Sequence, residues 1–298
     1  MKKLLALILT VLLLLSLAAC GVDSSLDDQN KPSQNGSGGS GNNGKNQITF
    51  NGLLAVDNAE CSIRITEIDA DNIWGYTLKV QLENKSSDKA YMFSVESAAI
   101  NGVQCDPFFA AEVSAAKKAN DEISFTDGDL EKIGIKEYTD IELTFRVYDS
   151  NDWSADDVVK ETVHIYPYGE DKAVKYVRSP QASDNVIVDN EYVTATVIGY
   201  EEDEIWGYTV KLFLLNKTVN NAMFSVEEAS VNRYMADPFF AQTVYSGMCA
   251  FASMSWSDTI LEENEITAIE EIEFNLRVYN DDDWFEDDWL NETVTLNP

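Results

Sequence analysis

The chain repeats one sequence pattern twice, and this repetition constrains the fold more than any other feature. Five blocks recur in the same order: Trp74-Gly75-Tyr76 as Trp206-Gly207-Tyr208, Met92-Phe93-Ser94-Val95 as Met223-Phe224-Ser225-Val226, Asp106-Pro107-Phe108-Phe109-Ala110 as Asp237-Pro238-Phe239-Phe240-Ala241, Arg146-Val147-Tyr148 as Arg277-Val278-Tyr279, and Asp152-Trp153 as Asp283-Trp284. The offset is 132 for the first block (206 minus 74) and 131 for the others (223 minus 92 for the second). An ordered match over this length indicates a domain duplication.

Within each repeat, apolar and polar residues alternate with a period of two, which predicts half-buried strands. In 76–83 the residues Tyr76, Leu78, Val80 and Leu82 share one face. The other segments that predict strands in the first repeat are 62–68, 91–100, 103–113, 119–125, 141–148 and 159–165. Short helical turns are expected at 129–136 and 262–269.

About seven strands in about 110 residues are typical of a two-sheet antiparallel sandwich. We therefore predict an all-β protein with two tandem immunoglobulin-like sandwiches, the first repeat at 48–167 and the second repeat at 188–298. The polar segment 168–187 between them is predicted to be a linker.

Turn residues separate the predicted strands. Asn84-Lys85-Ser86 and Asn216-Lys217-Thr218 fit a glycosylation pattern, but we interpret them as turns. Asn101-Gly102 is a strong hairpin signal. The second repeat has Asn232-Arg233 at this point, which leaves its hairpin type open.

The first residues have the pattern of a secretory signal peptide. Lys2 and Lys3 precede an apolar run, 4–15, which is followed by Leu17-Ala18-Ala19-Cys20. Residues 1–19 are therefore the predicted signal peptide. Residues 20–47 are rich in Gly, Ser and Asn and predict a flexible tether with a span on the order of 30 Å.

Leu17-Ala18-Ala19-Cys20 resembles the bacterial lipobox, and the tether after it resembles those of Gram-positive surface lipoproteins. The resemblance implies cleavage before Cys20 and a diacylglycerol on its thiol, which anchors the chain to the cell membrane on its extracellular side. The alternative is an ordinary secreted protein in which the cysteine is a coincidence. With its strand pattern and turns, the chain resembles tandem immunoglobulin-like domains of such lipoproteins. This implies a fold class and a location, but no catalytic motif.

The charge excludes one class of partner. The formal net charge is −31, and removal of Lys2 and Lys3 leaves 19 basic against 52 acidic residues, or −33. Nucleic acid binding requires a basic patch, so we expect no nucleic acid partner. Solubility and self-repulsion account for such a charge without any specific partner.

Cysteine and histidine are too few for the common catalytic and zinc sites. Cys61 and Cys105 align with Val193 and Ala236, so they are predicted to be small core residues, while a disulfide between them stays open. Cys249 has no partner in its own repeat. With His164 as the single histidine, the chain has no Ser-His-Asp or Cys-His arrangement.

Two acidic loops follow the same predicted strand in the two repeats. They offer the only metal ligands that we predict, for weak calcium binding through oxygen atoms: Asp149, Asp152 and Asp156 in one loop, and Asp281, Asp283 and Asp287 in the other. The loops lack EF-hand spacing. The alternative is a solvated loop whose Trp153 or Trp284 packs over the sandwich. No other cofactor is expected.

One strand face differs between the repeats. Lys118 and Asn120 in the first repeat correspond to Cys249 and Phe251 in the second, and Met248 and Tyr245 lie close by in the sequence. Exposed apolar and aromatic groups usually mark a contact surface. Tyr245, Met248 and Phe251 are therefore predicted interaction residues. The alternative is that they contact the first repeat or the linker.

These observations predict a membrane-anchored surface lipoprotein without enzyme activity, acting as a binding module for a protein or a glycan. The second hypothesis is an accessory subunit of a membrane complex of the same cell. The third is a hydrolase that uses two carboxylates, but 52 acidic residues make adjacent carboxylates common without any such role.

Overall fold

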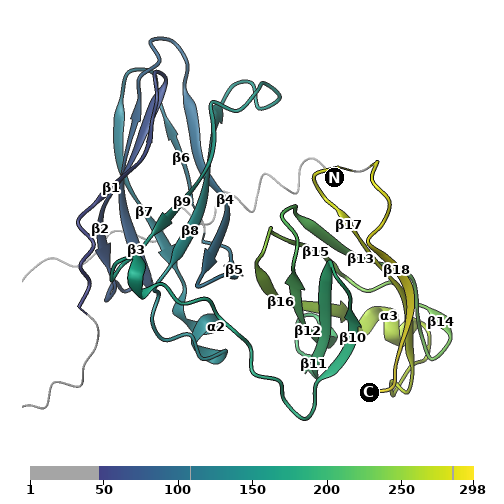
Figure 1. Ribbon diagram of the computed structural model, residues 1–298. Helices are drawn as coiled ribbons and strands as arrows, with labels where there is room; N and C mark the ends of the chain where they lie inside the picture. Colours follow the sequence, from purple (N-terminus) through teal and green to yellow (C-terminus); the bar gives the residue numbers. More distant parts are fainter. Residues whose placement is uncertain (1–46, 108, 284) are drawn as a thin grey trace, which may run out of the picture. The chain divides into compact units, whose positions relative to one another are not determined.

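The computed structural model describes residues 47–107, 109–283 and 285–298, and it shows an all-β protein (Figure 1). The predicted signal peptide, Cys20 and nearly all of the predicted tether lie outside these residues. Among the described residues, no helix is both long and apolar enough to cross a bilayer.

The first repeat forms two antiparallel sheets. Its elements are β1 (Leu53–Asp57), β2 (Cys61–Asp69), β3 (Tyr76–Asn84), β4 (Tyr91–Ile100), β5 (Val103–Cys105), β6 (Ala110–Val113), β7 (Lys118–Phe125), α2 (Asp127–Lys132), β8 (Ile141–Asp149) and β9 (Val159–Ile165). One sheet has the order β1-β2-β3-β7, and the other has β5-β4-β8-β9 with β6 paired to β4.

The alternation in the sequence accounts for the core. Ile141, Leu143, Phe145 and Val147 on β8 are fully buried, as the period of two predicted. They belong to one apolar cluster with residues of the other sheet, such as Leu78 on β3. Each such side chain contributes about 1.5–3 kcal/mol by leaving water, so the two inner faces hold the sheets together.

The second repeat has the same plan. After a short 3₁₀ helix, η1 (Glu170–Lys172), its elements are β10 (Asn185–Asp189), β11 (Val193–Asp203), β12 (Gly207–Asn216), β13 (Ala222–Val231), β14 (Tyr234–Met235), β15 (Ala241–Val244), β16 (Cys249–Trp256), α3 (Asp258–Glu263), β17 (Ile272–Asn280) and β18 (Leu290–Leu296). The strand orders are β10-β11-β12-β16 and β14-β13-β17-β18, with β15 paired to β13.

The structure differs from the predicted elements in three respects. The segment 103–113 forms two strands, β5 and β6, separated at Asp106 and Pro107, because proline has no N–H for a ladder. Strand β1 was not predicted. The helical turns begin earlier than expected, at Asp127 and Asp258, and the Ser257 side chain caps the second by accepting from the Ile260 amide.

The two predicted hairpin turns have the same backbone. Asn101 and Gly102 have φ of +53° and +81°, and Asn232 and Arg233 have +49° and +71°, which is the pattern of a type I′ turn. Each asparagine side chain donates to a carbonyl of the segment that precedes the neighbouring strand, Glu137 before β8 and Ala268 before β17, and this fixes the turn. The second repeat therefore keeps the turn although arginine replaces the glycine.

The Asn-Lys-Ser/Thr segments are turns, as predicted. The Asn84 and Asn216 side chains are almost fully buried. The Asn84 amide donates to the Lys89 and Val113 carbonyls, and the Asn216 amide donates to the corresponding Asn220 and Val244 carbonyls. A buried amide with these partners cannot carry a glycan.

The two repeats share a hydrogen-bonded junction. Strand β16 pairs in parallel with β5 at Cys249 and Val103, and the Cys249 amide donates to the Gly102 carbonyl at 3.1 Å. The linker reinforces this junction, since the Lys175 ammonium donates to the Gly247 carbonyl at 2.7 Å. Farther along the linker, Arg178 and Asp184 form a two-bond ion pair at 2.6 and 2.8 Å. The guanidinium lowers the pKa of the Asp184 carboxyl to about 2.

Candidate functional site

Exposed large apolar groups recur at the tip of the corresponding hairpin in each repeat. The tip between β2 and β3 carries Ile73 and Trp74, which are 89% and 69% exposed. The tip between β11 and β12 carries Ile205 and Trp206, which are 82% and 54% exposed. Exposure of large apolar groups to water is unfavourable, so their recurrence at the same point of both repeats indicates a contact surface.

Side-chain oxygens hold the backbone of both tips. The Asn72 Oδ1 atom accepts from the Trp74 amide at 3.0 Å. In the second repeat, Asp203 Oδ1 accepts from the amides of Ile205 and Trp206 at 2.8 and 2.9 Å. These bonds lower the pKa of the Asp203 carboxyl. The tryptophans therefore project from a fixed turn.

The glycine of the repeated Trp-Gly-Tyr block has a steric role. Gly75 and Gly207 have φ of +102° and +74°. A Cβ atom at Gly75 would lie 2.1 Å from the Phe125 carbonyl oxygen, and one at Gly207 would lie 2.3 Å from that of Trp256. Only glycine lets each tip lie this close to the neighbouring strand.

The second tip carries an aromatic stack. The Trp206 ring stacks on the Phe239 ring with centroids 5.7 Å apart and an interplanar angle of 18°. Phe239 is 75% exposed, and its amide donates to the Ser255 carbonyl at 2.7 Å. The corresponding Phe108 of the first repeat lies outside the described residues.

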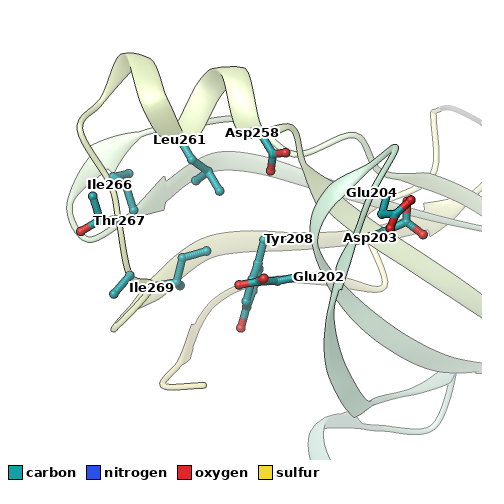
Figure 2. Close-up of a pocket in the computed structure, with 10 residues that line it drawn as sticks. Glu202, Asp203, Glu204, Tyr208, Asp258, Leu261, Ile266, Thr267 and Ile269 are labelled. Carbon is teal, nitrogen blue, oxygen red and sulfur yellow. The ribbon is translucent and has the colours of Figure 1, made fainter.

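A pocket of about 400 Å³ opens beside this tip (Figure 2). Its lining combines four carboxylates with apolar groups: Glu202, Asp203, Glu204, Tyr208, Asp258, Leu261, Ile266, Thr267, Ala268 and Ile269. Figure 2 shows Asp258 and Leu261 projecting from α3, and Tyr208 beside Glu202 on the paired strand. Burial, with Tyr200 and Glu202 nearby, raises the pKa of Tyr208 to about 12, so this phenol is a hydrogen-bond donor at neutral pH.

The predicted interaction residues do not form an open patch. Met248 and Cys249 are buried, and Cys249 belongs to the core cluster of the first repeat. The Tyr245 hydroxyl donates to the Glu96 carbonyl at 3.1 Å, and the Phe251 ring lies 6.2 Å from that of Tyr176 in the linker. The structure thus places Tyr245 and Phe251 at the contact with the first repeat and the linker, which was the alternative, and Met248 in the core of the second repeat.

Among the described residues, the structure gathers the three predicted calcium ligands of neither loop into a cage. Asp149 pairs with Lys89 at 3.3 Å, and Asp152 accepts from the Ser154 hydroxyl. Asp281 accepts from the Thr243 hydroxyl, Asp283 accepts from the Phe285 amide, and Asp156 and Asp287 are exposed. Over the described residues, no group of three or more His, Cys, Asp or Glu is arranged to hold a metal ion. Trp153 is exposed and does not pack over the sandwich, and Trp284 lies outside the described residues.

The three cysteines of the described chain are free thiols. Burial raises the pKa of Cys61 and Cys249 to about 11 and of Cys105 to about 12, so none is an activated nucleophile. His164 contacts Asp140 at 2.8 Å and stacks on Tyr166, on an exposed part of β9.

Comparison with known proteins shows no family. No family model matches the chain, and no curated protein matches it. The YadV chaperone structure aligns with 74% of this chain and 92% of its own, at 10% identity and a TM-score of 0.24. The exo-chitosanase CsxA of Amycolatopsis orientalis aligns with 78% of this chain but 26% of its own length, at 11% identity and a TM-score of 0.22. Neither likeness is close enough to assign a function.

Proposed function

We propose that this chain is a lipid-anchored surface lipoprotein that works by contact with a partner protein through its two hairpin tips. The observation that carries the proposal is the exposed Ile-Trp pair, Ile73-Trp74 and Ile205-Trp206, at the same tip of both repeats. Tryptophan is the residue type most enriched among those that dominate binding energy.

The fixed backbone of the tips supports the proposal. The asparagine and aspartate bonds and the close approach of Gly75 and Gly207 hold the tryptophans before a partner arrives. Little conformational entropy is then lost on binding, which favours affinity. The lipid on Cys20 and the tether would let the tips reach a partner while the chain stays on the membrane.

Crosslinking on intact cells, followed by pull-down and mass spectrometry, tests the proposal. The variant carries Trp74→Ala and Trp206→Ala, and the matched control is Trp153→Ala, because Trp153 is also exposed but lies outside the tips. Crosslinks that the double variant loses and the control keeps would support the tips as the contact surface. Identical crosslinks in all three proteins would refute it.

The identity of the captured molecule separates the remaining hypotheses. A membrane protein of the same cell would make the chain an accessory subunit of a complex. A protein from outside the cell would make it an outward-facing binding module. If only a surface glycan were lost with the tryptophans, the partner would be a polysaccharide instead.

A further inference from the structure

The two repeats differ at the pocket beside the second tip. In the first repeat, Tyr138 packs on Tyr76 with ring centroids 4.6 Å apart, and both rings are buried. In the second repeat the corresponding pair is Ile269 and Tyr208. Isoleucine is smaller than tyrosine, and a pocket of about 400 Å³ opens between these two residues and α3 (Figure 2).

Other differences between the repeats make this pocket more acidic than the corresponding part of the first repeat. Glu202 stands where the first repeat has Ala70, and Thr267 stands where it has Lys136. Together with Asp203, Glu204 and Asp258, Glu202 gives the lining four carboxylates, and none of its ten residues is basic. Carboxylates that face a shared, partly enclosed space repel one another, and a cation within it relieves this repulsion.

One side of the pocket is apolar. It is lined by Leu261 on α3, with Ile266 and Ile269 after it (Figure 2). A ligand that fits both surfaces has an apolar stem and a cationic end, which describes the side chains of lysine and arginine. Their N–H groups form charge-assisted hydrogen bonds with carboxylates, which are stronger than neutral ones.

The pocket adjoins the aromatic stack. Asp203 lines the pocket, and the same carboxylate accepts from the Trp206 amide at 2.9 Å. The Trp206 amide therefore lies beside the pocket, and the Trp206 ring carries the apolar stack with Phe239. A peptide with a basic residue followed by an apolar one matches this order.

We propose that the second repeat binds a lysine or arginine side chain of a partner peptide in this pocket, with a neighbouring apolar residue against Trp206 and Phe239. The inference rests on the proposed function only in that the peptide belongs to the protein contacted by the tips. The first repeat, with Tyr138 against Tyr76 and Ala70 in place of Glu202, does not take such a side chain.

Fluorescence anisotropy tests this with a fluorescein-labelled peptide, Gly-Leu-Lys-Leu-Gly, and its counterpart with glutamine in place of lysine. The full chain is used in non-ionic detergent, with detergent alone as the blank. We expect only the lysine peptide to bind, and its affinity to fall at high salt, because salt screens partly exposed charges.

Two variants separate the pocket from the general negative charge of the chain. Ile269→Tyr restores the aromatic residue of the first repeat without changing the charge and should weaken binding at least about tenfold. Glu202→Ala restores Ala70 at an exposed position and should weaken it roughly three- to tenfold. The control Glu292→Gln removes one negative charge at an exposed position on β18, away from the pocket. It should leave affinity within about twofold.

The outcomes are distinct from those of the cell experiment. Equal binding of both peptides, no binding of either, or equal losses in Glu202→Ala and Glu292→Gln would overturn the pocket and leave the tips untouched. If Ile269→Tyr fails to give the native near-ultraviolet circular dichroism, Glu202→Ala decides alone. Unchanged peptide binding in Trp206→Ala would overturn the contact of the apolar residue with Trp206.

Discussion

Replacement of Gly75 by alanine tests how the first tip is held. Gly75 has φ of +102°, and an added Cβ would lie 2.1 Å from the Phe125 carbonyl oxygen. The left-handed backbone alone costs alanine about 1 kcal/mol. The overlap forces the tip away from β7 and adds about 2 kcal/mol, as overpacking does elsewhere. We therefore expect Gly75→Ala to lower the free energy of unfolding by about 3 kcal/mol.

Gly134→Ala is the matched control within the same repeat. Gly134 has φ of +89°, but a Cβ there would meet no atom within 4 Å. It should lose only the backbone cost, about 1 kcal/mol. Urea unfolding followed by tryptophan fluorescence measures both, and with a slope of ~1–2 kcal/mol per molar the midpoints should fall by roughly 1.5–3 M and 0.5–1 M. Equal losses in the two variants would refute the close approach of the tip to β7.

Four further outcomes follow from features of the chain. Phe251→Asp should leave both repeats folded but speed proteolysis within 168–187, because the ring packs on Tyr176 in the linker; unchanged cleavage would contradict this contact. The folded pKa of Asp184 is depressed to about 2 from 3.8, so its stabilisation is present above pH 4 and is lost as the pH falls through 2. The melting temperature should therefore fall less between pH 4 and 2 in Asp184→Asn than in the wild type. Cys20→Ala should abolish labelling of the chain by a fatty-acid analogue, and continued labelling would exclude this cysteine as the lipid site. Melting temperatures in millimolar calcium and in chelator should be equal, since the described residues of the acidic loops form no cage, and a rise in calcium would restore the calcium hypothesis.

Alternation in the sequence was enough to predict most of the fold. On β8 every second residue is apolar and buried, so the strand and its inner face follow from local pattern alone. Strand β1 was missed because a bulge between Leu54 and Val56 breaks the period of two, so that the adjacent residues Ala55 and Val56 are both buried. The break at Pro107 was visible in the sequence, but the apolar residues on both sides suggested one strand.

The candidate site could be predicted only in part. The Trp-Gly-Tyr blocks marked the repeats, but the exposure of Trp74 and Trp206 depends on tertiary structure, since an aromatic residue next to a strand is as often buried. The pocket depends on Ile269, which is far from Glu202 in the sequence and meets it only in the fold. Conversely, Phe251 faces outward on its own strand as predicted, but the linker and the first repeat cover it.

The junction between β16 and β5 joins two non-equivalent edges of the same repeated unit. Such a contact does not close on itself, and if each unit offered both edges, chains could add end to end without limit. The free counterparts in this chain are the edge strands β7 and β14. Strand β7 carries Lys118 and Asn120 where β16 carries Cys249 and Phe251. Charged and polar residues on an edge discourage further pairing. We therefore expect the divergence of the two repeats to disfavour end-to-end pairing of chains through β7.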